Sequence, residues 1–151
     1  MKSIKFDHSE FKALSSSQLE AIFRLRQNVF IIEQQCFYED IDGSDQVASH
    51  LLLQLNDELA GYLRIFKPGI KYENAASLGR IVVQKNYRGT KIGKLLISKG
   101  IEIVRLNYPN SKIKIEAQAA LENYYSEFGF ITISDVYEVD QIPHVLMEMK
   151  G

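Results

Sequence analysis

One stretch, residues 79–96 with the sequence GRIVVQKNYRGTKIGKLL, constrains the fold of this chain more than any other. It reads as a β-branched strand, a loop with glycines, and the start of a helix with apolar residues at helical spacing. Backbone N–H groups and the positive end of the helix dipole converge at such a helix start and favour phosphate groups. The loop also carries positive charge on Lys85, Arg88, Lys91 and Lys94. The stretch therefore predicts an anion site between a strand and a helix.

Length and composition predict one compact domain over residues 1–151. The chain is 46% hydrophobic and 25% charged, and its 151 residues are enough to bury a sizeable core. Its 18 basic and 19 acidic residues nearly cancel, whereas a general nucleic-acid binder needs a basic face. We therefore expect no nucleic-acid partner.

The sequence also bears on the compartment. No apolar run approaches the roughly 20 residues that cross a bilayer, so we expect no membrane association. The first residues, MKSIKFDH, lack the apolar core of a signal peptide, and the only cysteine, Cys36, cannot form an intrachain disulfide. A reduced cytoplasm is the expected location.

Hydrophobic periodicity predicts an α/β (α+β) fold with the order β-α-β-β-β-α-β-α-β-β, a mixed sheet with helices on its faces. The first helix, of about four turns, is expected to begin with a capping box formed by Ser17 and Glu20. The second should start at Ile92 and end at a proline near residue 109, with an apolar face formed by Leu95, Leu96, Ile103 and Leu106. Strands are expected over residues 4–6, 50–55, 59–66, 77–84, 113–117, 130–139 and 145–149, and a third helix over residues 119–128.

An acidic segment follows the first helix, with Glu33, Glu39, Asp40, Asp42 and Asp45 within thirteen residues. Its plain interpretation is a solvated loop. An EF-hand needs its glycine at the sixth loop position, whereas the glycine here falls at the fourth. The three histidines and one cysteine show no zinc spacing either, so we predict no metal.

Two motifs resemble the GNAT superfamily of N-acetyltransferases. The RGTKIG loop of residues 88–93 is similar to its pyrophosphate-binding signature, Q/R-x-x-G-x-G/A, with Arg88 and Gly93 in register and Lys91 in place of the usual first glycine. The later segment LENYYSEFGF is similar to a second signature, a helix with a tyrosine four residues before Gly-Phe, which is Tyr125 here. Together with FIIEQQCFYEDIDG, EAQA and IPH, these motifs resemble the ElaA-like branch across roughly residues 19–149.

The resemblance implies the GNAT acyl-CoA N-acyltransferase fold, a mostly antiparallel mixed sheet that splays between the strands at residues 77–84 and 113–118. It also implies acetyl-CoA as the cosubstrate, and Gln118 stands where many members have a coenzyme-binding asparagine. The residues expected to bind the coenzyme are Ile81, Val82, Val83, Arg88, Gly89, Thr90, Lys91, Ile92, Gly93, Lys94, Gln118 and Asn123.

By the same resemblance, the reaction is transfer of the acetyl group to a primary amine by direct attack in a ternary complex. Tyr125 is the expected general acid, since a phenol with a pKa near ~10 can protonate the thiolate of a thiol whose pKa is ~8.5. Backbone N–H groups at the end of the strand at residues 81–83 would bind the developing oxyanion. The general base is left open among Glu33, Glu116 and His144.

The acceptor side of the cleft in this fold borders the segment after the first helix, where acids would attract a cationic amine. Glu33, Tyr38, Asp40, Asp42 and His144 are therefore expected to border the acceptor pocket. The sequence does not separate a small amine from an exposed amino group of a peptide or protein as the acceptor. It does not separate a monomer from a homodimer either.

Other interpretations compete with the enzyme. The loop at residues 88–93 could be a surface turn that caps a helix. A GNAT-fold protein could also bind coenzyme A, or have lost it through Lys91, and regulate a partner without turnover. A nucleotide-binding α/β domain is disfavoured, because neither G-x-x-x-x-G-K-S/T nor G-x-G-x-x-G occurs in the chain.

Overall fold

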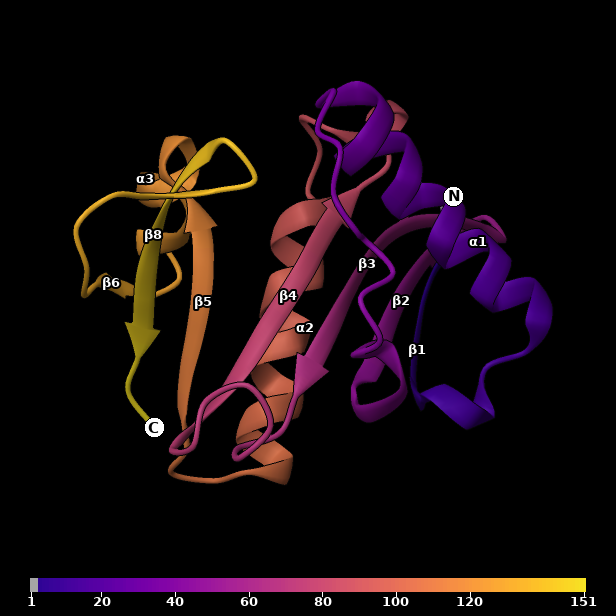
Figure 1. The fold of residues 1–151 in the computed structure, drawn as a ribbon. Coiled ribbons are helices and arrows are strands. Elements are labelled where there is room, and N and C mark those ends of the chain that lie inside the picture. Colours follow the sequence, from indigo (N-terminus) through magenta and orange to yellow (C-terminus); the bar gives the residue numbers. More distant parts are fainter. Residues whose placement is uncertain (1–2) are drawn as a thin grey trace.

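One eight-stranded sheet organises the computed structural model, which describes residues 3–151 (Figure 1). Its strands are β1 (Ile4–Glu10), β2 (Ser49–Leu55), β3 (Glu58–Phe66), β4 (Ala75–Val83), β5 (Lys112–Gln118), β6 (Ile131–Thr132), β7 (Tyr137–Val139) and β8 (Ile142–Met149). They lie in the order β1-β2-β3-β4-β5-β8-β6, and β7 also pairs with β8. Among these described strands, all pairs are antiparallel except β4 with β5. The predicted mixed sheet is confirmed, but the strand expected over residues 130–139 is divided into β6 and β7.

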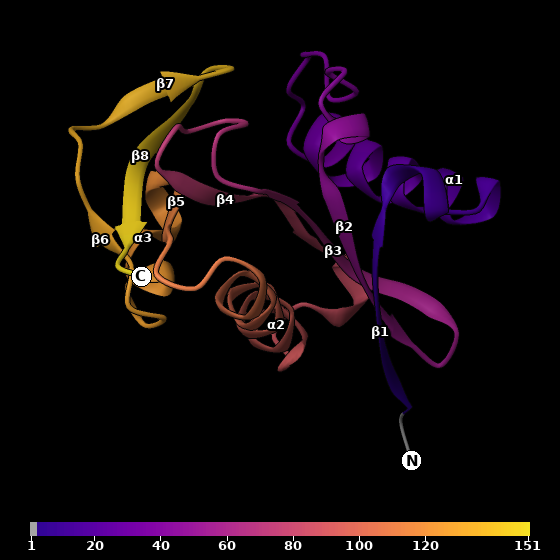
Figure 2. The same ribbon diagram turned by 90° about the horizontal axis from the view of Figure 1, so that it is seen from below.

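Helices cover both faces of this sheet (Figure 2). On one face, α1 (Ser16–Arg26) and a π-helical turn (Gln27–Glu33) bury Ile22, Leu25 and Val29 against side chains of β2, β3 and β4. On the other face, α2 (Ile92–Asn107) buries Leu96 and Val104 in a larger apolar cluster. Because both faces are covered, the central strands are apolar on both sides, as the runs in β2 and β3 show.

The first helix begins two residues earlier than predicted. Ser15 forms the capping box: its Oγ accepts from the backbone N–H of Gln18 at 3.1 Å, and Gln18 Oε1 accepts from the backbone N–H of Ser15 at 2.8 Å. The predicted box at Ser17 and Glu20 is therefore wrong. Three consecutive serines offer similar spacings to a polar partner, so the motif alone does not fix the helix start.

The predicted apolar face of α2 is confirmed in part, since Leu96 and Ile103 are buried. Leu95 and Leu106 are 37% and 74% exposed, whereas the buried side of the helix includes Ile97, Gly100 and Val104. Gly100 permits close packing, since an added Cβ would lie 3.0 Å from a leucine side chain of β3. A search for large apolar residues alone overlooks this glycine, although it lies on the buried side of α2.

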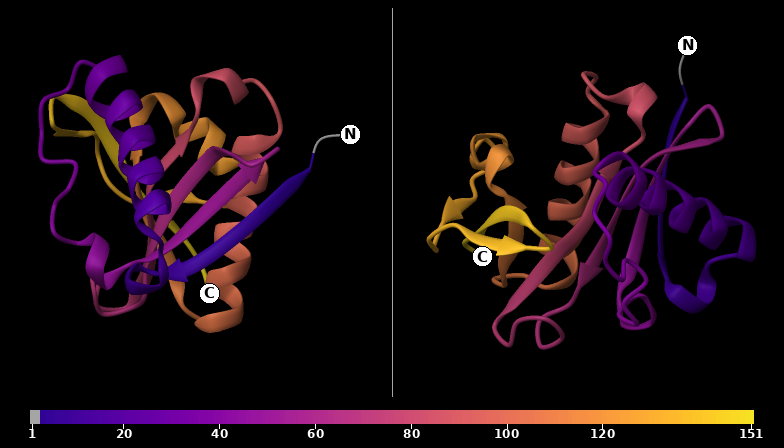
Figure 3. Two further views of the ribbon diagram at one scale, coloured as in Figure 1. Left: turned by 90° about the vertical axis from the view of Figure 1, so that its right-hand side faces the viewer. Right: turned by 45° about the horizontal axis from the view of Figure 1, so that its top comes forward.

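The C-terminal part of the chain forms a separate group of elements beside α2. A 3₁₀ turn (Ala119–Leu121) leads into α3 (Glu122–Ser126), so the helix predicted over residues 119–128 is shorter and irregular at its start. Tyr125 of α3 packs edge to face against Phe130, with 6.3 Å between the ring centroids. The right-hand view of Figure 3 shows α3 and β8 in orange and yellow on one side of α2, with the N-terminal strands and α1 on the other.

The two central strands β4 and β5 touch only at their beginnings. They form three parallel residue pairs, from Ala75 with Lys112 to Ser77 with Lys114, and then diverge (Figure 1). This is the splay that the sequence predicted. Within residues 3–151, no helix has the length and apolar character needed to span a membrane.

Candidate active site

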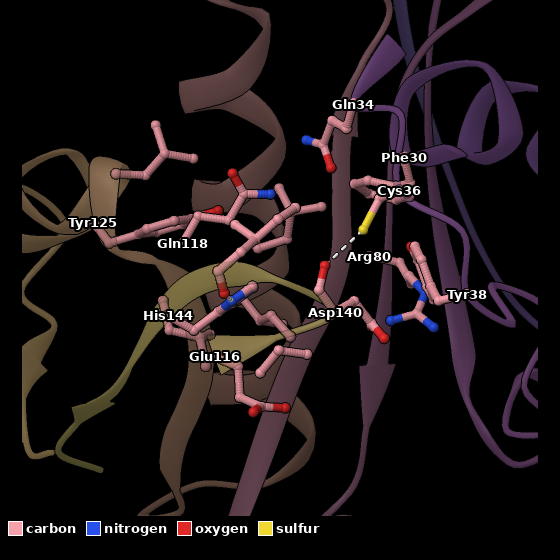
Figure 4. Close-up of a pocket in the computed structure, with 17 residues that line it drawn as sticks. Phe30, Gln34, Cys36, Tyr38, Arg80, Glu116, Gln118, Tyr125, Asp140 and His144 are labelled. Carbon is pink, nitrogen blue, oxygen red and sulfur yellow. Dashed lines mark hydrogen bonds between the residues drawn. The ribbon is translucent and has the colours of Figure 1, made fainter. Parts of the chain in front are cut away.

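A pocket of about 150 Å³ lies where β4 and β5 diverge (Figure 4). The residues expected from sequence that line it are Tyr38, Ile81, Glu116, Gln118, Tyr125 and His144. Glu33, Asp40, Asp42 and the loop at residues 88–94 lie outside this lining. Within the described part of the chain, no group of three or more His, Cys, Asp or Glu side chains is placed to hold a metal ion.

Tyr125 enters the pocket from α3 (Figure 4). The residue is 7% exposed, and its ring packs edge to face against Phe130 and Tyr124, which fixes its direction. Burial raises the pKa of its hydroxyl above the ordinary value. The phenol is therefore protonated at neutral pH and able to donate a proton.

His144 faces the pocket from β8, directly opposite Gln118 of β5. Its Nδ1 lies 2.7 Å from the backbone carbonyl oxygen of Ile142. A carbonyl oxygen only accepts hydrogen bonds, so we assign the ring proton to Nδ1 and a free lone pair to Nε2. An imidazole in this tautomer can take a proton from an amine through Nε2.

Glu116 lies on the same face of β5 as Gln118, because side chains two residues apart share a face of a strand. Its carboxylate accepts hydrogen bonds from Lys71 Nζ at 2.8 Å and from the Tyr137 hydroxyl at 2.9 Å. Burial opposes ionisation here, but the two hydrogen bonds and the charge of Lys71 outweigh it and lower the pKa of Glu116. A carboxylate engaged in this way, with a lowered pKa, is poorly suited to the role of general base.

The strand β4 carries a bulge at the pocket. Gly79 pairs with Arg64 of β3, and Val82 pairs with Tyr62. Between these pairs, two residues of β4 lie opposite a single residue of β3, which is the pattern of a β-bulge. The first of the two, Arg80, has φ +49°. This left-handed conformation costs a residue with a side chain roughly 1–2 kcal/mol. The bulge lies beyond the last β4–β5 pair, so the β5-facing backbone of β4 has no strand partner within residues 3–151.

The loop before α2 accepts Lys91 without strain. Lys91 is the N-cap residue of α2 and has φ −77°, a conformation open to any side chain, so glycine is not required there. Gly89 differs, with φ +75°. Gly93, in the first turn of α2, lies close to α3: an added Cβ would lie 2.8 Å from the hydroxyl oxygen of Tyr124, so that side chain would have to shift. Glycine is thus required by backbone conformation at residue 89 and favoured by close packing at residue 93.

Arg88, the first residue of this loop, forms an ion pair with Glu33 at the end of the π-helical turn. Its guanidinium donates two hydrogen bonds to the Glu33 carboxylate, at 2.5 and 3.1 Å. These bonds lower the pKa of Glu33. A paired carboxylate with a lowered pKa, outside the pocket, is poorly suited to the role of general base.

The other residues expected at the coenzyme site fall into two groups. Thr90 supports the start of α2, since its Oγ1 accepts from the backbone N–H of Ile92 at 3.3 Å, and Lys94 is exposed on the first turn. Val82, in contrast, is buried on the α1 side of the sheet, and Asn123 is exposed on α3 outside the pocket lining. The side chain of Val82 therefore points away from the cleft.

The acidic segment after α1 is only in part the solvated loop of the plain interpretation, because Asp40 and Asp45 are buried whereas Glu33, Glu39 and Asp42 are exposed. Arg26 of α1 is fully buried, and it donates from Nε to Asp40 at 2.9 Å and from Nη1 to Asp45 at 2.8 Å. Arg64 of β3 donates to Asp45 at 3.0 Å and to Asp42 at 2.7 Å. Buried charges need such partners, because an unpaired charge in the interior is costly.

A third arginine extends this arrangement to the pocket. Arg80 Nε lies 2.9 Å from Asp40 Oδ1, and its Nη2 lies 3.3 Å from Asp42 Oδ2. Its guanidinium also lies 5.4 Å from the ring centroid of Tyr38. The charges of the three arginines and three aspartates cancel, so Asp40 and Asp42 do not supply the net negative charge expected to attract a cationic amine. We call this set the ionic cluster: Arg26, Arg64, Arg80, Asp40, Asp42 and Asp45.

Sequence reasoning missed the contribution of Cys36 and Asp140 to the pocket. Cys36 Sγ donates to the backbone carbonyl oxygen of Asp140 at 2.8 Å, which joins the segment after α1 to the turn between β7 and β8 (Figure 4). Asp140 and Gln141 have φ values of 50° and 68°, typical of a two-residue hairpin turn. The two bonded residues are 104 positions apart, so only the tertiary fold brings them together.

Comparison with known proteins now defines the class. The family model described as "Acetyltransferase (GNAT) domain" matches residues 12–151. The chain therefore belongs to the GNAT acetyltransferase family, as its motifs predicted. The two main motifs on which that prediction depended, residues 88–93 and 121–130, lie at the start of α2 and around α3.

Individual relatives narrow this class to its ElaA-like branch. Protein ElaA of Escherichia coli (strain K12) is 44% identical over 142 residues, which cover 93% of this chain and 90% of that protein. The crystal structure of Escherichia coli ElaA matches with a TM-score of 0.91 and 39% identity, covering 98% of this chain and 100% of that chain. An acyl-CoA N-acyltransferase from Pseudomonas aeruginosa matches with a TM-score of 0.92 and 31% identity, covering 97% of this chain and 99% of that chain.

Proposed function

We propose that the protein is an acetyl-CoA-dependent N-acetyltransferase that acetylates a primary amine by direct attack in a ternary complex. The observation that carries this proposal is the meeting of a proton acceptor, His144 Nε2, and a proton donor, the Tyr125 hydroxyl, in one pocket at the splay. Membership of an acetyltransferase family supports the reaction class. The two groups are the ones that amine attack on a thioester requires.

The residues present fit an acyl-coenzyme A. The start of α2 offers backbone N–H groups beside Gly89, and the side chains of Arg88, Lys91 and Lys94 add positive charge for a pyrophosphate. The unpaired edge of β4 offers backbone groups to an extended arm, and Tyr125 lies on the opposite wall of the splay. The coenzyme supplies the acetyl thioester, and the chain supplies the proton transfers and the charge stabilisation.

Each step has a candidate group. The neutral amine attacks the acetyl carbon, and His144 Nε2 takes the proton that the nitrogen loses as the carbon–nitrogen bond forms and the carbon–sulfur bond breaks. Backbone N–H groups at the bulge of β4 stabilise the negative charge that develops on the acetyl oxygen. Tyr125 gives its proton to the departing sulfur. Glu116, held ionised by Lys71 and Tyr137, favours the positive charge that His144 acquires.

The size of the pocket indicates what kind of acceptor it can admit. A cavity of about 150 Å³ holds a group of about the size of benzene, so it admits the amine-bearing end of an acceptor rather than a large molecule. We therefore propose a small amine or an exposed amino group of a peptide or protein. The free thiol of Cys36 is compatible with a reducing compartment, and we propose the cytoplasm.

The test combines binding with an acceptor screen. Acetyl-CoA and coenzyme A should raise the melting temperature of the protein, and ATP should not, because a ligand that binds only the folded state stabilises it. Amino acids, polyamines, aminoglycosides and peptides are then offered with acetyl-CoA, and free thiol and acetylated product are measured. Coenzyme binding without acetylation of any amine would favour a coenzyme-binding regulatory protein instead.

A further inference from the structure

We propose that Arg80 is a positioning residue: its ion pairs with Asp40 and Asp42 hold the bulge of β4 in the conformation that faces the acetyl group. This inference rests on the proposed function, because it concerns the same pocket. It assigns the acidic segment after α1 a task in the reaction other than attracting the acceptor. The aspartates act through Arg80 and through the backbone of β4.

The first observation is that the backbone at Arg80 needs an external support. Arg80 has φ +49°, in the middle of a strand, where a residue with a side chain is strained. Glycine would adopt this conformation freely, yet the glycine of this segment, Gly79, lies one position earlier and outside the left-handed region. The sequence thus places the strain on a residue whose side chain can be held. The contacts of that side chain must keep the bulge in place.

The second observation is that the support is itself rigid. Asp40 binds the fully buried Arg26 at 2.9 Å, and Asp42 binds the nearly buried Arg64 at 2.7 Å. These arginines belong to α1 and β3, so each aspartate is tied to a regular element at the same time as it binds Arg80. The ionic cluster therefore acts as a fixed frame around the guanidinium of Arg80.

The third observation is where Arg80 lies. It lines the pocket (Figure 4). The next residue, Ile81, is also part of the pocket lining. Regular pairing with β3 resumes at Val82. The strained peptide is therefore the part of β4 that presents backbone groups to the reacting carbonyl. A displacement of about 1 Å at a reacting centre can cost roughly 10²-fold in rate, so the frame has a direct effect on catalysis.

The experiment compares three substitutions at one position. Arg80→Ala keeps the strain and removes the ion pairs, Arg80→Gly removes both, and Arg80→Lys keeps the charge. Arg24→Ala, on the exposed side of α1, is the matched control. We measure kcat and KM with the best acceptor and, independently, amide hydrogen exchange over residues 78–84 and over β1 and β2.

We expect kcat to fall by about 10- to 100-fold in Arg80→Ala, with faster exchange confined to residues 78–84. Arg80→Lys should recover part of both effects, and Arg80→Gly should exchange more slowly than Arg80→Ala, because its bulge is not strained. Arg24→Ala should match the wild type. If Arg80→Ala does not fold, Arg80→Lys and Asp42→Asn carry the same comparison.

Two results would overturn the proposal. One is wild-type kcat together with wild-type exchange over residues 78–84 in Arg80→Ala. The other is faster exchange that spreads equally to β1 and β2, with no recovery in Arg80→Lys, which would indicate a purely structural role. If the wild type acetylates no amine, the proposed function fails, and the exchange data alone still decide whether Arg80 holds the bulge.

Discussion

His144 and Tyr125 owe their protonation states to different neighbours. The carbonyl oxygen of Ile142 places the ring proton of His144 on Nδ1, and burial keeps the hydroxyl of Tyr125 protonated. The pocket therefore presents an imidazole nitrogen with a free lone pair and a protonated phenol. These are the two groups to which we assign the roles of base and acid in the proposed reaction.

At Tyr125, the expected effect is on chemistry rather than binding. Tyr125→Phe keeps the ring packed on Phe130 and removes only the hydroxyl. We expect kcat to fall by roughly 10²-fold or more, with acetyl-CoA affinity nearly unchanged, since that is the range for loss of a general acid. Steady-state kinetics and calorimetric binding measure the two quantities. Unchanged kcat, with chemistry shown to limit the rate, would return Tyr125 to a packing role.

On the alkaline side, kcat should stay level up to about pH 10, because the raised pKa of Tyr125 means that its acid function is lost only above the ordinary phenol value. Steady-state kinetics from neutral to alkaline pH measure this profile. The proposed base is tested separately: His144→Gln removes the imidazole that accepts the proton and should lower kcat. Unchanged kcat in His144→Gln would assign the role of general base to another group.

At the scale of elements, Gly93 of α2 lies in close contact with Tyr124 of α3. Gly93→Ala would place a Cβ against the hydroxyl of Tyr124, and such overpacking costs about 1–3 kcal/mol. Chemical denaturation should show this loss, and Gly93→Ala combined with Tyr124→Phe should recover part of it. Lys91→Gly is the control in the same loop, with little loss of stability. Equal losses in the single and double variants would mean that Tyr124 is not the obstacle.

The sequence predicts those elements whose signal is local. The helix start at Ile92 and the strand before it follow from glycines, β-branched residues and periodicity within one stretch. The capping box at Ser15 was missed because several serines satisfy the same local rule. For α2, Leu96 and Ile103 were predicted correctly, but Leu95 and Leu106 are exposed because several apolar residues fit the helical spacing equally well. The division between β6 and β7 depends on how each pairs with β8, which is tertiary.

The residues of the candidate site also divide into those with a local sequence signal and those that only the tertiary fold reveals. Tyr125 and the loop at residues 88–93 lie in motifs, so the sequence proposes them directly. Arg80 and Cys36 carry no local signal, because their partners are distant in the chain. The acidic segment is misleading in sequence, because a run of charges usually indicates solvent exposure. The arginines that neutralise it come from α1, β3 and β4, which are distant in the chain.

At the scale of the whole molecule, the ionic cluster makes stability depend on acid. Burial opposes ionisation of Asp42, but hydrogen bonds from Arg64 and from the backbone N–H of Ser44 lower its pKa well below the usual range. A lowered folded-state pKa gives stability that is complete above the unfolded value and is lost as the pH falls through the folded one.

We therefore expect the melting temperature to be nearly constant from pH 7 to about pH 5 and to decline below about pH 4. Asp42→Asn should melt lower at pH 7 and show a shallower decline in acid, because one of the paired carboxylates is gone. Scanning calorimetry from pH 7 to pH 2 measures both slopes. If the melting temperature declines equally steeply with acid in the wild type and in Asp42→Asn, Asp42 does not contribute to the acid dependence of stability.

The short contact between β4 and β5 has a mechanical consequence. Three residue pairs join the two strands at one end, and the hydrogen bond from Cys36 to Asp140 bridges the pocket between the segment after α1 and the β7–β8 turn. A thiol is a weak donor, so this bridge adds little to the cohesion of the two sides. One buried apolar cluster, however, runs from Leu63 of β3 through Leu96 of α2 to Ile113 of β5 and Met147 of β8. The width of the pocket is therefore set by packing of the core beneath it, and loss of the Cys36 bond alone should leave the two walls in place.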